Sequence, residues 1–238
     1  MTRAEWLEIE SGERLLDLLE GHGRLAGGKA RLLMCALART MQDDLCDSRS
    51  ARAVDLAEAS ADDPGTAAAL AQACAEARAA EQALANAFVE AITATRGKWR
   101  KHVKEASRRA AAATVAAWAA DTHSLGFLGW MTDGGGYYLD APAHIRHALG
   151  ENPDLIREVF ACPTDPPGLE PAWLAWQAGT VPKLATLIYG AKRFDELPVL
   201  ADALEEAGCT DADIISHLRD PGPHVRGCWA LDLVLGKG

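Results

Sequence analysis

The chain has 238 residues, of which 49% are hydrophobic and 24% charged, a balance that excludes an intrinsically disordered chain. A chain of this length buries roughly 70% of the surface that its unfolded form exposes, so its core needs no disulfide or metal. Its 24 Lys and Arg against 34 Asp and Glu give a net charge of -10, which argues against a protein that coats nucleic acid or anionic lipid over its whole surface. Composition alone points to no particular chemistry.

The start of the chain, MTRAEWLEIE, contains acids and no apolar run, which is not the pattern of a signal peptide or a presequence. The longest stretch of low polarity, residues 110–120, is mostly alanine and falls well short of the ~20 apolar residues that a membrane span needs. We therefore expect a cytoplasmic protein that does not contact membranes. Its six cysteines are then expected to be reduced thiols.

Helical periodicity dominates the first half of the chain, and no window shows the alternation of a strand. Short helices are predicted over 13–20 and 29–45, and Asp47 or Ser48 can begin a third that ends near residue 59. Two long helices follow, over 66–95 and 98–121, and half of the residues between 67 and 94 are alanine. A break at Gly97 would make them an antiparallel hairpin.

A glycine-rich segment, residues 122–152, contains the triplet Gly134-Gly135-Gly136 and is the predicted connection between two parts of the chain. Short helices are predicted after it, with Trp173 and Trp176 as core anchors; they span 153–160, 180–189, 197–207, 211–218 and 224–235. The sequence thus predicts an all-α protein. We expect an antiparallel helical bundle with a long alanine-rich hairpin (66–121) inside an N-terminal part (1–121), and a C-terminal part (153–238) of short helices.

Three segments carry a resemblance to known proteins: MTRAEWL, KARLLMCALARTMQDDLCDSRSARAVDLAE and LPVLADALEEAGCTDADIISHLRDPGPHVRGCWALDLVLGK. Together they resemble an abundant paralogous family of planctomycete-type bacterial proteins. The resemblance implies no established activity, cofactor or catalytic residue. The chain departs from the family where Leu218 stands in place of a cysteine after His217. Separately, DPGPHVRGCWALDLVLGK is similar to half of a HEAT-type unit, and one such unit predicts a local likeness at most.

Two thiols and two imidazoles within twenty residues, Cys209, His217, His224 and Cys228, are the inventory of a tetrahedral zinc site. The spacing argues against that interpretation, because seven, six and three residues separate them whereas zinc ligands usually come in close pairs. Only His224 and Cys228 would share a helical face. We therefore predict a core unit that binds no metal, with a final helix made amphipathic by Val225, Trp229 and Leu233.

A basic stripe, residues 96–109, carries seven Lys and Arg against one acid and is the one strongly positive part of the chain. It is a candidate contact for a polyanion or an acidic partner, and the alternative is a solvated helix face. Its members are Arg96, Lys98, Arg100, Lys101, Lys104, Arg108 and Arg109.

No motif of useful specificity for catalysis appears, so the sequence favours a non-catalytic interaction or scaffold module that binds another protein and needs no cofactor. Two alternatives stay open. One is a nucleic-acid-associated protein that uses the basic stripe. The other is a metal-binding module or an enzyme that uses the C-terminal Cys/His group.

Overall fold

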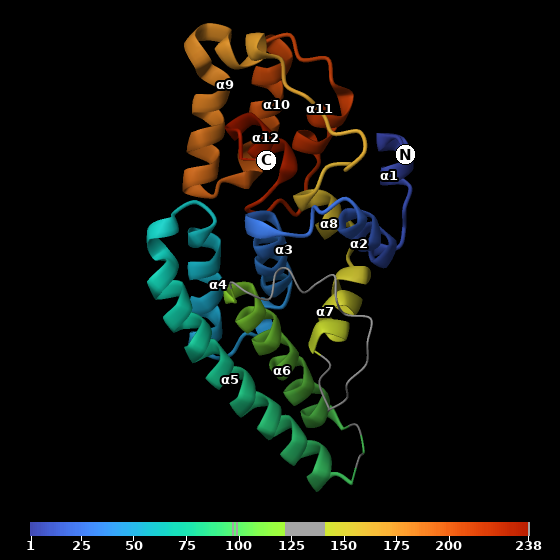
Figure 1. Cartoon of the computed structure of the whole chain (residues 1–238), viewed down its shortest axis with the longest axis vertical. Coiled ribbons are helices and arrows are strands. Elements are labelled where there is room, and N and C mark those ends of the chain that lie inside the picture. The colour runs from blue at the N-terminus through green and yellow to red at the C-terminus, as the bar shows by residue number, and fades with distance from the viewer. Residues whose placement is uncertain (97, 99, 122–140, 238) are drawn as a thin grey trace. The chain divides into compact units, whose positions relative to one another are not determined.

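The computed structural model describes residues 1–96, 98, 100–121 and 141–237, and every regular element in these ranges is a helix (Figure 1). The predicted all-α fold is confirmed. Contacts divide the chain into two units: Ser11–Leu155, called here the hairpin unit, and Met1–Glu10 together with Ile156–Gly238, called here the C-terminal unit.

The hairpin unit contains α2 to α7, with two long helices side by side (Figure 1). Helix α5 packs along α6, and α4 packs against both. Ala73, Ala77 and Ala80 of α5 are buried, and their small side chains let neighbouring helix backbones approach closely. The helices are α2 (Gly12–Gly21), α3 (Gly27–Thr40), α4 (Ser48–Ser60), α5 (Ala67–Ala94), α6 (Lys101–Ala120) and α7 (Ala141–Gly150).

Side-chain caps define where α2 and α4 begin. Asp47 accepts a hydrogen bond from the amide of Arg49 and starts α4, as the sequence predicted. Helix α3 ends at Thr40, earlier than expected, because the chain tightens into a 3-10 turn at Gln42–Asp44. Part of the predicted connection forms α7 instead, while the glycine triplet lies outside the described residues.

The C-terminal unit consists of short helices and one longer, broken helix, with the first ten residues of the chain packed among them. Arg3 of α1 explains this placement, because its Nη1 atom lies 2.7 Å from Asp211 and 3.1 Å from Asp213. The sequence predicts these first residues in the N-terminal part (1–121), because the segment MTRAEWL contains no local signal of its distant partners. The helices are α1 (Arg3–Leu7), α8 (Pro153–Val159, shared with the end of the hairpin unit), α9 (Pro171–Ala191), α10 (Leu197–Glu206), α11 (Ala212–Arg219) and α12 (Trp229–Leu235).

The core of this unit lies between α9, α10, α11 and α12. Trp173 is buried in it, as predicted, and Trp176 packs against it half-buried. Helix α9 breaks at residues 176–179, where Gln177, Ala178 and Gly179 all have positive φ. The sequence predicts a helix that starts at residue 180, and the second part of α9 begins there, just after the break.

Helix α12 begins at Trp229, whereas the sequence predicted a start at His224. Residues 221–228 form a turn instead, because Gly222 takes a φ of +84° and a Cβ there would lie 2.5 Å from the amide nitrogen of His224. The later start also changes the inward face. The buried apolar positions are Ala230, Leu231 and Val234, in place of the predicted set of Val225, Trp229 and Leu233, which are all half-buried.

Candidate metal centre

Four side chains of the C-terminal unit converge on one point: Glu158, His217, His224 and Cys228. One ligand atom from each lies within 4.8 Å of the others. The structure therefore brings together three of the four Cys/His residues that the sequence singled out. Cys209 lies apart from them in the hydrophobic core, and Glu158 takes the fourth place.

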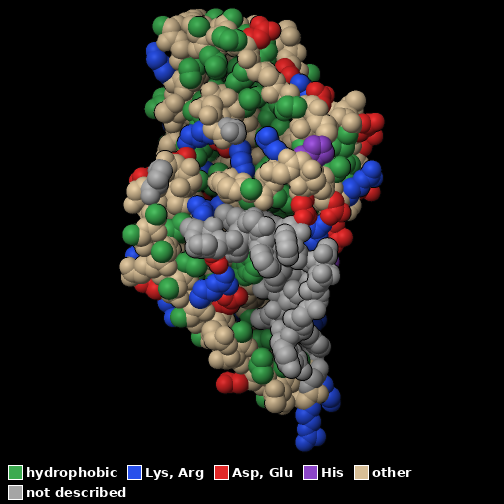
Figure 2. All heavy atoms as spheres, in the orientation of Figure 1, with side chains coloured by type: hydrophobic (Ala, Val, Ile, Leu, Met, Phe, Trp, Pro, Cys, Tyr) green, Lys and Arg blue, Asp and Glu red, His purple; other side chains and the backbone are tan. Residues whose placement is uncertain are grey.

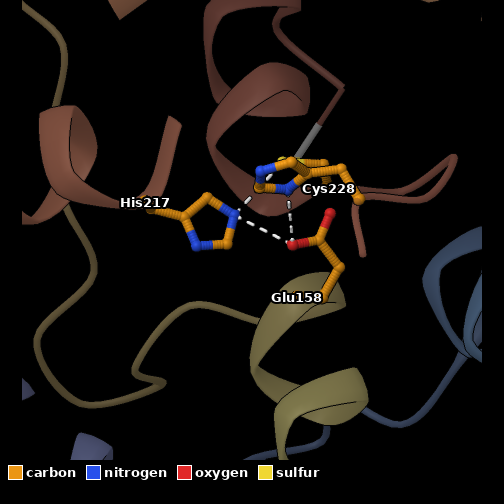
Figure 3. Close-up of side chains that lie close together, drawn as sticks. Glu158, His217 and Cys228 are labelled. Atoms are coloured by element: carbon orange, nitrogen blue, oxygen red, sulfur yellow. Dashed lines mark hydrogen bonds and ion pairs between the residues drawn. The ribbon is translucent and has the colours of Figure 1, made fainter. Parts of the chain in front are cut away.

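Glu158 stands near the end of α8, and its side chain points toward His217 and Cys228 (Figure 3). One carboxylate oxygen, Oε1, accepts a hydrogen bond of 3.1 Å from the amide of Val225. The other, Oε2, lies 3.1 Å from His217 Nε2 and 3.0 Å from His224 Nδ1. The backbone thus holds one oxygen and presents the other to both imidazoles.

The environment of Glu158 favours its charged form. Burial alone would raise the pKa of this carboxyl, but the hydrogen bonds from His217 and His224 outweigh burial and lower the pKa to about 2. Burial likewise acts to lower the pKa of His224, and the Glu158 carboxylate overrides it and raises that pKa above its ordinary value. A buried, ionised carboxylate in this place is stabilised by a positive charge at the centre of the cluster.

His224 is oriented by the turn before α12. Its Nε2 atom lies 2.9 Å from the backbone carbonyl oxygen of Asp220, to which it donates, so Nδ1 is the nitrogen that faces the cluster. A histidine that ligates a metal usually donates its second ring N–H to a carbonyl or a carboxylate in this way, which fixes the tautomer. With Nε2 protonated, Nδ1 facing a carboxylate requires either a proton or a metal ion between the two.

Cys228 and His217 complete the cluster. The Sγ atom of Cys228 lies 3.3 Å from His217 Nε2 at the start of α12, and the residue is fully buried. The His217 ring, at the end of α11, lies against Trp229 with ring centroids 4.8 Å apart. Burial raises the pKa of the Cys228 thiol well above its ordinary value, and the nearby Glu158 raises it further.

These distances are close to those of a tetrahedral metal site. Metal bonds of about 2.0–2.3 Å place the corners of a tetrahedron about 3.3–3.7 Å apart. Three of the six separations, 3.0, 3.1 and 3.3 Å, fall a few tenths of an ångström short of this edge, and the other pairs lie within 4.8 Å, so side-chain shifts of up to about an ångström would let the cluster accept an ion. The spacing of the Cys and His residues argues against zinc only if Cys209 is the fourth ligand, and Glu158 takes that place in the structure.

The same residue types could suggest a cysteine nucleophile with a histidine base and a carboxylate. Such a triad uses the two nitrogens of one imidazole, one for the nucleophile and one for the acid. Here a single atom, His217 Nε2, faces both Cys228 Sγ and Glu158 Oε2. A thiol whose pKa is raised is also the opposite of an activated nucleophile. The arrangement therefore fits metal binding and does not fit thiol catalysis.

The seven residues of the basic stripe lie around the free end of the α5–α6 hairpin, and all seven are exposed. Figure 2 shows Lys and Arg side chains at that end. Arg108 pairs with Asp44 at 3.2 Å and Arg109 with Glu105 at 2.5 Å. Within the described part of the chain the other five have no acidic partner; they are Arg96, Lys98, Arg100, Lys101 and Lys104.

Comparison with known proteins adds no functional information. The chain matches none of the protein-family models, curated proteins or solved structures with which it was compared. Among the described helices, none has the length and apolar character to cross a membrane.

Proposed function

We propose that the C-terminal unit is a metal-binding module that holds one Zn²⁺ between Glu158, His217, His224 and Cys228. The single observation that carries this proposal is the convergence of four ligand atoms within 4.8 Å of one another. In a set of isolated hydrogen-bonded pairs, each polar atom would face one partner. Here two atoms, Glu158 Oε2 and His217 Nε2, each face two partners, so the ligand atoms are directed at a common region.

The donor set favours zinc over other common ions. Two imidazole nitrogens, one thiolate and one carboxylate form a mixed set of borderline and soft ligands, whereas Mg²⁺ and Ca²⁺ require oxygen ligands. Zinc accepts four-coordinate sites of nitrogen, sulfur and oxygen without a strong preference for one geometry. A bound ion would displace the proton of the Cys228 thiol, which offsets the cost of ionising a buried group.

The supporting groups around the cluster are of the kind that orient metal ligands. The amide of Val225 holds Glu158, and the carbonyl of Asp220 holds His224. Both come from the turn between α11 and α12, which therefore contributes ligands as well as the groups that orient them. A turn built around Gly222 and two prolines has little freedom to collapse away from this geometry.

The test is elemental analysis of protein purified without a metal-affinity column. We expect one zinc per chain, at a stoichiometry close to that of the protein. Cys228→Ala should lose the zinc, whereas Cys209→Ala should retain it. Both changes remove a buried thiol from the same unit, so their difference reports ligation and not the loss of a core side chain.

A second ligand variant separates metal binding from packing. Glu158→Gln keeps the shape of the side chain and removes its charge, and it should weaken zinc at least about tenfold, as changes around metal ligands typically do. The proposal is wrong if the wild-type protein contains no zinc and binds none when zinc is added after reduction of its thiols.

A second candidate function belongs to the hairpin unit, where we propose that the basic stripe binds the phosphate backbone of a nucleic acid. The observation that favours it is that five of the seven basic side chains are exposed without an acidic partner at one end of a long hairpin. Contacts of this kind are electrostatic, so binding should weaken steeply as salt rises.

The two paired arginines supply the control for this candidate. Changing Arg100, Lys101 and Lys104 together to Gln should abolish binding of a generic duplex in a low-salt titration. The change of Arg108 and Arg109 to Gln should have a much smaller effect, because acids already neutralise these two. Equal losses from both sets, or no binding by the wild-type protein, would leave the stripe as a solvated face.

A further inference from the structure

A cavity of about 220 Å³ adjoins the metal cluster within the C-terminal unit. Residues of α1, of the end of α8 and of α11 and α12 line it. Of the four cluster residues only His217 belongs to its wall. The His217 side chain is 19% exposed, against 7% for Glu158 and 5% for His224, and Cys228 is fully buried. Glu158, His224 and Cys228 thus lie on the buried side of the proposed metal position, and His217 lies between that position and the cavity.

His217 is also the least anchored of the ligands. The second oxygen of Glu158 and the second nitrogen of His224 each have a backbone partner. Among the described residues, His217 Nδ1 has no hydrogen-bond partner, and the ring is held by its contacts with Trp229 and His224. A ligand without such support exchanges more easily, and three fixed ligands with one exchangeable position form the pattern of an accessible zinc site.

The cavity itself indicates what could replace His217. Its charged lining residues are two arginines and two aspartates, Arg3, Arg157, Asp213 and Asp220, so their formal charges cancel. A Zn²⁺ ion bound to the Glu158 carboxylate and the Cys228 thiolate is also formally neutral. A neutral ligand therefore fits better than an anion, whose charge nothing in the site would balance.

The shape and size of the cavity restrict the class of ligand further. Two indole side chains, Trp6 and Trp229, belong to the lining, and such walls favour flat aromatic molecules. The volume of about 220 Å³ corresponds to about seven waters at ~30 Å³ each, which is enough for a heterocycle of one or two rings. His217 already shows that an imidazole ring packs beside Trp229 at this position.

We propose, resting on the zinc site proposed above, that this cavity binds a small neutral nitrogen heterocycle whose ring nitrogen takes the metal position held by His217. The C-terminal unit is then a receptor for such a ligand, and the three buried residues Glu158, His224 and Cys228 keep the metal in place during the exchange.

The test uses the full chain loaded with Co²⁺, whose visible absorption reports its ligands. Benzimidazole should change the spectrum saturably, whereas indole, which has the same size and shape but no free ring-nitrogen lone pair, should not. Benzoate is the anionic control and should bind at least about tenfold more weakly than benzimidazole.

Two variants locate the exchange. His217→Ala should retain Co²⁺ and bind imidazole more tightly than the wild-type protein, because no side chain competes with it. His224→Ala removes a ligand that does not line the cavity, so it should lose Co²⁺ and not be rescued by imidazole.

The outcomes distinguish the two proposals. A wild-type protein that binds no Co²⁺ overturns both. A protein that binds Co²⁺ with a spectrum that benzimidazole leaves unchanged overturns the cavity proposal alone and indicates a closed, structural site. The wild-type titration decides this even if a variant fails to fold.

Discussion

Glu158 and His224 form a buried pair that a proton can bridge when no metal is present. Despite burial, hydrogen bonds from His217 and His224 lower the pKa of Glu158 from 4.5 to about 2, so these interactions stabilise the fold above about pH 4.5, and that stability is lost as the pH falls toward 2. The pKa of His224 is raised above 6.5, so its contribution is complete below that value and is lost as the pH rises through the raised pKa.

Metal-free protein should therefore gain most from this pair between about pH 4.5 and 6.5. Urea unfolding across pH, with a chelator present, measures this dependence. Glu158→Gln should flatten the profile in that window. Zinc should reverse the trend above pH 7, since the ion competes with protons for both imidazoles. A metal-free protein whose stability rises steadily from pH 5 to 8 would contradict the pairing.

Leucines in the C-terminal unit differ widely in burial. Leu204 of α10 is fully buried, and Leu187 of α9 is 61% exposed. We expect Leu204→Ala to lower the free energy of unfolding by about 2–5 kcal/mol through lost burial and a cavity. The matched change Leu187→Ala should cost within about 0.5 kcal/mol. Chemical denaturation of the two variants compares them directly, and similar losses from both would contradict the described core.

Helix α9 is broken at residues 176–179, and the backbone conformation there is unfavourable for the residues that adopt it. Ala178 is exposed and has a φ of 57°, a conformation that disfavours any residue with a Cβ. Ala178→Gly removes this strain, and it should raise the free energy of unfolding by about 0.5–1 kcal/mol, seen as a higher melting temperature.

Ala172 supplies the control for this substitution. It is exposed in the regular first turn of the same helix, so Ala172→Gly should lower stability, because glycine disfavours helix. If both glycine variants lower the melting temperature, the positive φ at Ala178 is not a feature of the protein in solution.

The elements that the sequence predicted well are those with local signals. Asp47 and Asp211 cap α4 and α11, and the hydrogen bonds they make span only two or three residues. The start of α12 is predicted too early because Glu158, 66 and 67 residues earlier in the chain, binds His224 and the amide of Val225 at the expected start. Glu158 could not be found at all, since its partners lie 59 and 66 residues later and only the tertiary fold brings them together. Three of the four cluster residues, His217, His224 and Cys228, are candidates in the sequence analysis, whereas Glu158 is not.

For the whole molecule, the division into two units predicts two unfolding transitions with different responses to metal. Chelation should lower the melting temperature of the C-terminal unit by several degrees, since a ligand at 100 times its Kd contributes about 2.7 kcal/mol. The transition of the hairpin unit should not move. Differential scanning calorimetry with and without chelator measures both.

Core variants assign the two transitions. Leu204→Ala should lower the metal-sensitive one, and Leu33→Ala, which removes a fully buried side chain of α3, should lower the other. A chelator that shifts both transitions equally would contradict the assignment of the metal to one unit.

The contact between Arg3 and Asp211 joins residues that are 208 positions apart in the chain. At about 5–20 residues per second, a ribosome takes on the order of 10–40 seconds to reach Asp211 after Arg3. During that interval α1, at five residues, is too short to persist as an isolated helix, so Trp6 is synthesised early and buried late. The C-terminal unit, with the cluster of Glu158, His217, His224 and Cys228 and the adjoining cavity, is thus completed only after its last helix, α12, has been synthesised. Until then the nascent chain displays an indole side chain that chaperones can recognise.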